Sequence, residues 1–277
     1  MRNQNVDTIT EATLNTFADM PDGRLKILME GLVKHLHAFA KEVKLTEPEW
    51  TQAIKILTDS GHKCTDKRQE FILWSDVLGL STLVNSMNNQ KPEGCTESTV
   101  FGPFFVEHAP AYKNGEDISK DAPGARCLVD CRITGLNGAP IVGAKVNVWQ
   151  ADEDGFYDVQ YETLDYSRAR GELKSDEQGR IYFKSIVANA YPIPTDGPVG
   201  DMLLACKRHP WRPAHLHFMI EAPGYETLIT QVFRDGEEYL DSDAVFGVRE
   251  SLVTDWVEQA DGSFTLNYEF VLNPSKS

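Results

Sequence analysis

The chain has 277 residues, 41% hydrophobic and 25% charged, which is enough for one large domain or one domain with an appendage. This composition excludes disordered, collagen-like and coiled-coil fibrous proteins. No run of eighteen apolar residues occurs, and the N-terminus has neither a signal-sequence nor a transit-peptide pattern, so we expect a soluble, cytoplasmic protein. A net charge of −15 disfavours nucleic acid and anionic membranes as partners.

The apolar residues of the first 90 positions recur at intervals of three and four, which predicts amphipathic helices. The first carries an apolar stripe from Leu25 to Val43. The second is predicted to begin at Thr46, where Thr46-Glu47-Pro48-Glu49 forms a capping box, and to end at Gly61. A third is predicted from Lys67 to Met87. These helices are too short and too few to form a free-standing bundle. Their apolar stripes are therefore expected to pack on the rest of the chain or on a second copy of it.

Residues 88–99 are polar and contain Gly and Pro, which predicts a linker, and short extended runs follow Gly102-Pro103. Six strands are predicted, at 127–134, 144–150, 180–185, 214–221, 227–233 and 263–272. Turn pairs between strands, Asn137-Gly138, Asp154-Gly155, Gln178-Gly179, Pro223-Gly224 and Asp235-Gly236, suit an antiparallel β-sandwich. The fold class is therefore mainly β, with a helical region and linker at residues 1–99 and a β-sandwich domain at residues 100–277.

The five cysteines are odd in number and form no C-x-x-C pair, so reduced and mostly buried thiols are expected. Cys127 and Cys131 lie on one face of a predicted strand, four residues apart. This separation is too long for easy bonding, so no disulfide is expected between them.

The segment Arg212-Pro213-Ala214-His215-Leu216-His217 is the most distinctive local feature. In a strand, His215 and His217 project from the same face with their backbones about 7 Å apart. Two imidazoles so placed can bind one metal ion, whereas as ordinary buried histidines each would need a hydrogen-bond partner. The acidic turn 152–154 could complete a zinc or ferrous site, but a solvated turn ending at Gly155 explains it more simply.

Two tyrosines are further candidates. Tyr157 follows the Asp154-Gly155 turn, and Tyr191 lies in the segment 190–194, where Pro192 and Pro194 hold the backbone extended. A phenol with a pKa of about 10 ionises at neutral pH only beside a strong Lewis acid, which ferric iron is and magnesium or calcium is not. The alternative is that both tyrosines are packed with hydrogen-bonded hydroxyls.

Three segments in this order resemble the intradiol ring-cleaving dioxygenases, a family of non-haem ferric enzymes. They are Gly155-Phe156-Tyr157, the segment from Tyr191 to Pro198 and the segment from Arg212 to Phe218, with Gln231 in the following strand. The resemblance covers nearly the whole chain. It implies Fe(III) as the cofactor, dioxygen and a small aromatic diol or triol as substrates, and four iron ligands: Tyr157, Tyr191, His215 and His217.

The resemblance also implies catalytic roles. Tyr191 leaves the iron when the diol binds, and its phenolate accepts a substrate proton. Arg212 stabilises negative charge on the ring, and Gln231 orients a reaction intermediate. From structure alone, Arg212 could pair with a carboxylate and Gln231 could hydrogen-bond across strands. The sandwich is then the catalytic domain, and the helical region forms a homodimer whose apolar tunnel holds a phospholipid in relatives.

Within the family, the segments 149–160 and 100–104 most resemble the hydroxyquinol-cleaving members. This implies benzene-1,2,4-triol as substrate and 3-hydroxy-cis,cis-muconate, or its keto form maleylacetate, as product. Asp76 lies on the apolar stripe of the third predicted helix and needs a partner, which the third hydroxyl would supply; a helix end or a nearby arginine is the alternative. The resemblance places the following residues at the substrate: Leu73, Asp76, Val100, Phe101, Gly102, Pro103, Phe104, Ile193, Pro194 and Arg212.

Three alternatives stay open. Within the class, catechol or a chlorocatechol is the substrate. Outside it, the segment 138–149 is also typical of non-catalytic, transthyretin-like binding modules, which would be colourless. A zinc or ferrous enzyme using His215, His217 and Asp158 is the third. Ferric phenolate ligation instead predicts a wine-red protein with a broad visible absorption band.

Overall fold

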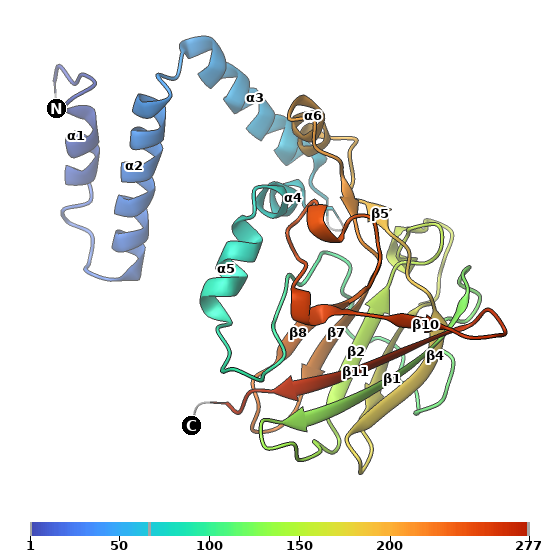
Figure 1. Cartoon of the computed structure of the whole chain (residues 1–277). Coiled ribbons are helices and arrows are strands. Elements are labelled where there is room, and N and C mark those ends of the chain that lie inside the picture. The colour runs from blue at the N-terminus through green and yellow to red at the C-terminus, as the bar shows by residue number, and fades with distance from the viewer. Residues whose placement is uncertain (1, 66–67, 276–277) are drawn as a thin grey trace. The chain divides into compact units, whose positions relative to one another are not determined.

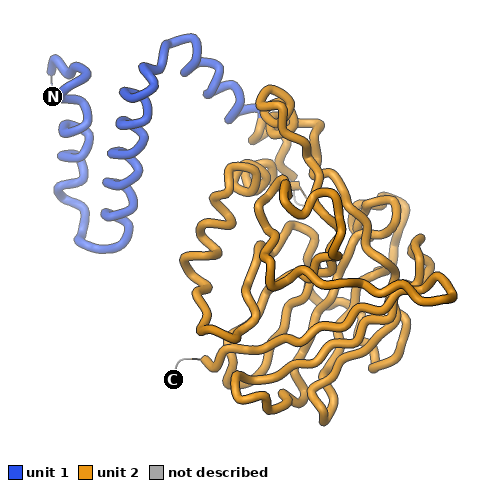
Figure 2. Tube along the Cα trace, viewed as in Figure 1, with its two compact units in different colours: residues 1–59 blue, residues 60–277 orange. Residues whose placement is uncertain are grey.

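The computed structural model describes residues 2–65 and 68–275. Contacts along the chain divide it into two compact units, residues 1–59 and residues 60–277 (Figure 2). None of the described helices is both long enough and apolar enough to cross a membrane.

The first unit is helical. It contains α1 (Ile9–Asn15), α2 (Arg24–Glu42) and most of α3 (Glu47–Lys63). The helix predicted on the Leu25–Val43 stripe is confirmed as α2, and the capping box of α3 is formed, with the Thr46 amide donating to Glu49 Oε2 at 2.9 Å. The short helix α1 was not predicted.

The end predicted for α3 at Gly61 is wrong, because the helix continues to Lys63. A glycine inside a helix costs only about 1 kcal/mol relative to alanine. Ser60, beside it, is fully buried and its hydroxyl accepts a hydrogen bond from Trp74 Nε1 at 2.8 Å. This tertiary contact holds the last turn of the helix in place.

The third predicted helix is two helices, α4 (Glu70–Val77) and α5 (Leu80–Asn88), and its predicted start at Lys67 lies outside the described residues. The break falls at Gly79, which has a left-handed φ of 74° and donates its amide to Asp76 O. Glycine at this position ends a helix without steric cost. A further helix, α6 (Pro198–Ala205), was not predicted, although it begins with proline in its first turn.

Two larger sheets make up much of the rest of the second unit (Figure 1). One has the order β10-β11-β1-β4 and the other β3-β2-β7-β8-β9, while β5 and β6 pair separately. The strands are β1 (Arg126–Gly135), β2 (Lys145–Gln150), β3 (Arg170–Lys174), β4 (Arg180–Ile186), β5 (Tyr191–Pro192), β6 (Trp211–Arg212), β7 (His215–Glu221), β8 (Leu228–Arg234), β9 (Val253–Thr254), β10 (Trp256–Glu258) and β11 (Phe264–Leu272). Short 3-10 helices lie at η1 (Asp158–Gln160), η2 (Leu240–Ser242) and η3 (Glu250–Leu252).

All six predicted strands are confirmed, and the mainly β fold with a helical N-terminal region is correct. The glycines of the five predicted turns all have φ between 73° and 81°. Most strand pairs are antiparallel, but β1 pairs with β11, and β8 with β9, in parallel. The strands of a parallel pair are not joined by a tight turn, so turn residues in the sequence do not predict which strands pair in this way. The strands that were missed have two to five residues, too few to show a period.

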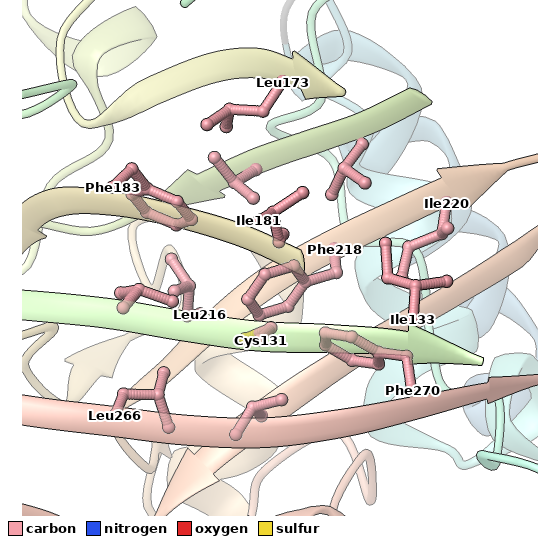
Figure 3. Close-up of a cluster of buried hydrophobic side chains, with 14 of the residues drawn as sticks. Cys131, Ile133, Leu173, Ile181, Phe183, Leu216, Phe218, Ile220, Leu266 and Phe270 are labelled. Carbon is pink, nitrogen blue, oxygen red and sulfur yellow. The ribbon is translucent and has the colours of Figure 1, made fainter. Parts of the chain in front are cut away.

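The core lies between the two sheets, where side chains from β1, β4 and β11 face side chains from β2, β3 and β7 (Figure 3). Cys127 and Cys131 belong to this core, and burial raises the pKa of Cys127 to about 12, so it is a protonated thiol. All five cysteines are free, as expected. They are less buried than expected, because Cys206 is exposed and two others are only partly covered.

Candidate metal centre and substrate cavity

Strand β7 presents the two histidines on one face. His215 lies opposite Phe233 of β8, and His217 lies between Trp149 of β2 and Gln231 of β8. Both imidazoles are about 1% exposed, whereas Leu216 and Phe218 point into the core between the sheets. The alternation predicted for this segment is therefore confirmed.

Donor atoms from three residues meet above this face. Tyr157 Oη lies 3.1 Å from His217 Nε2 and 3.5 Å from His215 Nε2, and the two Nε2 atoms are 3.2 Å apart. The ring of Tyr191 crosses that of Tyr157 at 87°, with centroids 5.5 Å apart. Ligands held about 2 Å from one ion are about 3 Å from each other, so the spacing suits a shared metal.

Hydrogen bonds and stacking orient the imidazoles. His215 Nδ1 lies 2.7 Å from Pro213 O, so this nitrogen carries the proton and leaves the lone pair of Nε2 free for a metal. The ring of His217 stacks on Trp149 at 4.7 Å, and its Nδ1 is buried without a partner. A Cβ on Gly102 would lie 3.1 Å from His217 Cε1, so glycine lets the backbone approach the ring.

The protonation states in the absence of a cation also fit a metal site. Burial lowers the pKa of His215 to about 3 and that of His217 well below its usual value, so both imidazoles are neutral donors. Burial raises the pKa of Tyr157, with the nearby Tyr191 acting in the same direction. Without a cation this phenol stays protonated, so its use as a phenolate ligand requires a strong Lewis acid.

The described residues contain no group of three or more His, Cys, Asp or Glu side chains placed to hold a metal ion. Asp158, the carboxylate of the zinc or ferrous alternative, pairs with Arg170, whose Nη2 lies 2.5 Å from Asp158 Oδ1. The Asp158 carboxylate is thus engaged by Arg170, whereas Tyr157 Oη lies 3.1 Å from His217 Nε2.

Arg212 lies beside the four candidate ligands and is fully buried. Its Nη1 is 3.5 Å from Tyr191 Oη and 3.2 Å from His215 Nε2, and its Nη2 donates to Gln231 Oε1 at 2.9 Å. Burial by itself lowers the pKa of Arg212, but the charge and hydrogen bond of Asp243, together with the two tyrosines, raise it overall, so the guanidinium stays positive. The three residues with catalytic roles implied by resemblance, Tyr191, Arg212 and Gln231, thus lie together beside the two histidines.

A cavity of about 1100 Å³ opens next to Tyr191 and Arg212. Nearly all the residues expected at the substrate line it: Leu73, Asp76, Val100, Gly102, Pro103, Phe104, Ile193, Pro194 and Arg212. Phe101 is absent from this lining. Its ring packs instead on Phe105 and Trp149, with centroids 4.9 and 5.8 Å away.

Three features of the site were missed from the sequence. Val245 lines the cavity, and Asp243 binds Arg212. Both lie after η2 in an irregular segment without periodicity, so no sequence signal marked them. The cavity wall formed by residues 158–162 and 164–167 was also not foreseen.

Comparisons with known proteins show the family to which the chain belongs. A family model described as "Dioxygenase" matches residues 100–274, and one described as "Catechol dioxygenase N terminus" matches residues 22–96. The chain is 60% identical to a 6-chlorohydroxyquinol 1,2-dioxygenase of Cupriavidus pinatubonensis, over 99% of this chain and 100% of that protein. It is 49% identical to a hydroxyquinol 1,2-dioxygenase of Nocardioides simplex, over 93% of this chain and 87% of that protein.

Solved structures show the same fold. The hydroxyquinol 1,2-dioxygenase of Pseudomonas putida DLL-E4 superimposes with a TM-score of 0.92 and 43% identity, covering 98% of this chain and 99% of the other. The 3-chlorocatechol 1,2-dioxygenase of Rhodococcus opacus 1CP gives a TM-score of 0.80 at 28% identity, covering 91% and 99% of the two chains. This chain therefore belongs to the intradiol ring-cleavage dioxygenases and is an enzyme of that class.

Proposed function

We propose that this dioxygenase cleaves hydroxyquinol, benzene-1,2,4-triol, between its two adjacent hydroxylated carbons. The product is 3-hydroxy-cis,cis-muconate, or its keto form maleylacetate. The names of several relatives support this substrate, among them the enzymes of Nocardioides simplex and Rhodococcus opacus, each 49% identical. The observation that carries the proposal is the Asp76 carboxyl group, which is 8% exposed and lines the cavity.

The proposed cofactor is Fe(III), held by Tyr157, Tyr191, His215 and His217. Their spacing, the neutral imidazoles and the buried phenols support it, as does the family to which the chain belongs. Ferric iron bound there would take up the aromatic diol as its dianion and make the ring reactive toward dioxygen.

The residues around this centre have separate tasks. Tyr191 lines the cavity whereas Tyr157 is fully buried, which supports Tyr191 as the phenol that meets the substrate and takes its proton. The Nη1 edge of Arg212 points toward the same place, where it stabilises negative charge on the bound ring. The Gln231 amide donates to Val100 O at 2.8 Å, which ties it to the cavity wall.

Asp76 is proposed to select the third hydroxyl of the triol. Burial raises the pKa of this carboxyl, and Ser81 and Arg212 offset the shift only in part. A buried carboxyl group is costly unless it is hydrogen-bonded. Hydroxyquinol supplies a hydroxyl group for this purpose, whereas catechol leaves the carboxyl without that partner, so the site favours the triol.

Replacing Asp76 with alanine is expected to lower the ratio of kcat/KM for hydroxyquinol over catechol by at least about 10-fold. Oxygen uptake on both substrates measures this ratio. Asp201→Ala, an exposed position in α6, serves as the control and should leave the ratio unchanged. An unchanged ratio in Asp76→Ala would show that this carboxyl does not select the substrate.

A second candidate substrate is a ring-chlorinated hydroxyquinol. The 60% identity to the enzyme of Cupriavidus pinatubonensis favours it, and a cavity of about 1100 Å³ leaves room for a ring substituent. Oxygen uptake on hydroxyquinol, 6-chlorohydroxyquinol and catechol, compared in one preparation, ranks the three. Faster turnover of catechol than of either triol would overturn the proposed substrate.

Residues 1–99 are proposed to form a homodimerisation region with an apolar tunnel for a phospholipid, beside a catalytic domain at residues 100–277. The apolar stripe of α2 supports this, because Leu25, Leu28, Leu32 and Leu36 are each at least half exposed. The cytoplasmic location stays a prediction.

Sedimentation analysis should give twice the chain mass of 31.1 kDa for the unaltered protein. Leu32→Glu should convert it to a monomer, because a charge on the stripe cannot be buried between two copies. Lys34→Glu, a charged position on the same helix, should leave the dimer intact. A monomeric unaltered protein would contradict the proposal. Mass spectrometry of an organic extract tests for the phospholipid.

A further inference from the structure

Asp243 is a buried carboxylate to which the family resemblance gives no role. Its side chain is 2% exposed and both oxygens are used. Oδ1 accepts from Arg212 Nε at 3.0 Å and from the Val245 amide at 3.3 Å. Oδ2 accepts from Arg212 Nη2 at 3.2 Å and from the Gly247 amide at 2.8 Å. The carboxylate therefore joins the loop at 243–247 to the guanidinium of Arg212.

This contact determines which edge of the guanidinium faces the reaction. The Nε and Nη2 edge is held by Asp243, and Nη2 also donates to Gln231 Oε1. Nη1 is the remaining nitrogen, and it lies toward Tyr191 Oη and His215 Nε2. A two-point pair between arginine and carboxylate fixes orientation as well as distance.

We propose that Asp243 is a positioning residue, which holds the Nη1 edge of Arg212 against the substrate ring during cleavage. The inference rests on the proposed function, because it assigns Asp243 to the step in which Arg212 stabilises charge on the ring. The hydrogen bonds of Asp243 go to Arg212, Val245 and Gly247 and to none of the candidate metal ligands, and Asp243 is absent from the residues that line the substrate cavity. It therefore acts through Arg212.

Two neighbouring residues, Gly247 and Asp76, also bear on the position of the guanidinium. A Cβ on Gly247 would lie 2.7 Å from Arg212 Nη2 and 3.1 Å from Asp243 Oδ2, so the glycine leaves just enough room for the pair. Asp76 is a second carboxyl close enough to feel the charge of Arg212. Asp243 pairs with Arg212 at two points, whereas Asp76 lines the substrate cavity.

The main test is Asp243→Asn, which keeps the shape and one acceptor oxygen but removes the charge and the second acceptor. The cleavage rate kcat is expected to fall about 10- to 100-fold, as is typical for partners one step behind an active-site group. The dissociation constant of hydroxyquinol, measured without oxygen from the change in the visible absorption band, should change less than about 3-fold. The band of the substrate-free protein should stay, because the metal ligands are untouched.

A double-mutant cycle shows whether Asp243 acts through Arg212. If it does, adding Asp243→Asn to Arg212→Ala should lower kcat no further, although each change alone lowers it. Glu226→Gln is the matched control for loss of a carboxylate from an ion pair. Glu226 Oε2 lies 2.6 Å from Lys91 Nζ, and neither residue lines the substrate cavity. The Glu226→Gln variant should leave kcat unchanged. Its change in thermal stability shows how much stability the loss of one paired carboxylate costs, for comparison with Asp243→Asn.

If Asp243→Asn does not fold, Gly247→Ala tests the same pair, because the added Cβ would lie 2.7 Å from Arg212 Nη2 and displace the guanidinium. A similar loss in kcat, with binding and visible band retained, is expected. Independent losses that multiply in the double variant, or an unchanged kcat in both Asp243→Asn and Gly247→Ala, would overturn the assignment. Failure of the proposed function would look different, because the unaltered protein would then lack the visible band or the cleavage of the triols.

Discussion

Tyr157→Phe is expected to weaken and shift the phenolate absorption band of the iron-loaded protein, because Tyr191 would remain as a phenolate ligand, and to reduce ring cleavage more than about 100-fold. Even partners that only support metal ligands cost 10- to 100-fold when removed. Tyr157 is fully buried, and its Oη lies 3.1 Å from His217 Nε2 and 3.5 Å from His215 Nε2. Phenylalanine keeps the ring, which stacks on Phe104 with centroids 4.4 Å apart, and removes only the donor oxygen.

Visible spectroscopy, iron analysis and oxygen uptake measure this outcome on one preparation. Tyr268→Phe is a suitable control, because the Tyr268 hydroxyl donates to Ser251 O at 2.8 Å and lies outside the substrate cavity. That variant should keep both band and activity. A Tyr157→Phe protein with an unchanged band and unchanged activity would rule out Tyr157 as a ligand. The alternative of a zinc or ferrous centre would then have to be considered again.

Arg170→Met is expected to have the largest effect on stability, lowering the free energy of unfolding by about 3–5 kcal/mol. Arg170 and Asp158 are 2% and 5% exposed, and the guanidinium meets both carboxylate oxygens. Methionine has a similar length but no charge, so Asp158 is left buried without its partner. Asp158 directly follows Tyr157, so iron content is expected to fall as well.

Denaturant unfolding measures the loss. Arg180→Met removes one partner of an exposed pair with Asp130 and should cost less than about 1 kcal/mol. Replacing both members of the buried pair, in Arg170→Met with Asp158→Leu, should recover part of the loss, because no uncompensated charge is then buried. Equal losses in Arg170→Met and Arg180→Met would show that the buried pair adds nothing to stability.

The parts of the fold predicted correctly depend on neighbours in the chain. The stripe of α2, the capping box of α3 and the turn glycines are all read within a few residues. The alternation of His215 and His217 on β7 is likewise a local property. The predicted helix at 67–87 was wrong where a single glycine, Gly79, redirected the chain between two helices with continuous apolar character.

The placement of single side chains was harder to predict. Asp76 was expected to face the cavity, and it lines the cavity. This prediction was possible because a carboxyl group on the apolar stripe of a helix can be recognised from its neighbours in the sequence. Phe101 was expected at the substrate because its neighbours are there, but its ring points to Trp149 instead. Which residue of a segment faces a cavity depends on the direction of each Cα–Cβ bond, and the surrounding strands set that direction.

By itself, the sequence determined the strand and helix periods, the tyrosines and histidines proposed to bind a metal, and the order of their motifs, since all of these are local patterns of residue type. The tertiary structure decided which charged groups became partners. Asp243 lies 31 residues from Arg212, and Asp158 lies 12 residues from Arg170, in segments without a shared period. A buried charge pairs with whichever opposite charge the packed chain brings within hydrogen-bonding distance, and only the folded arrangement of the strands and loops specifies that choice.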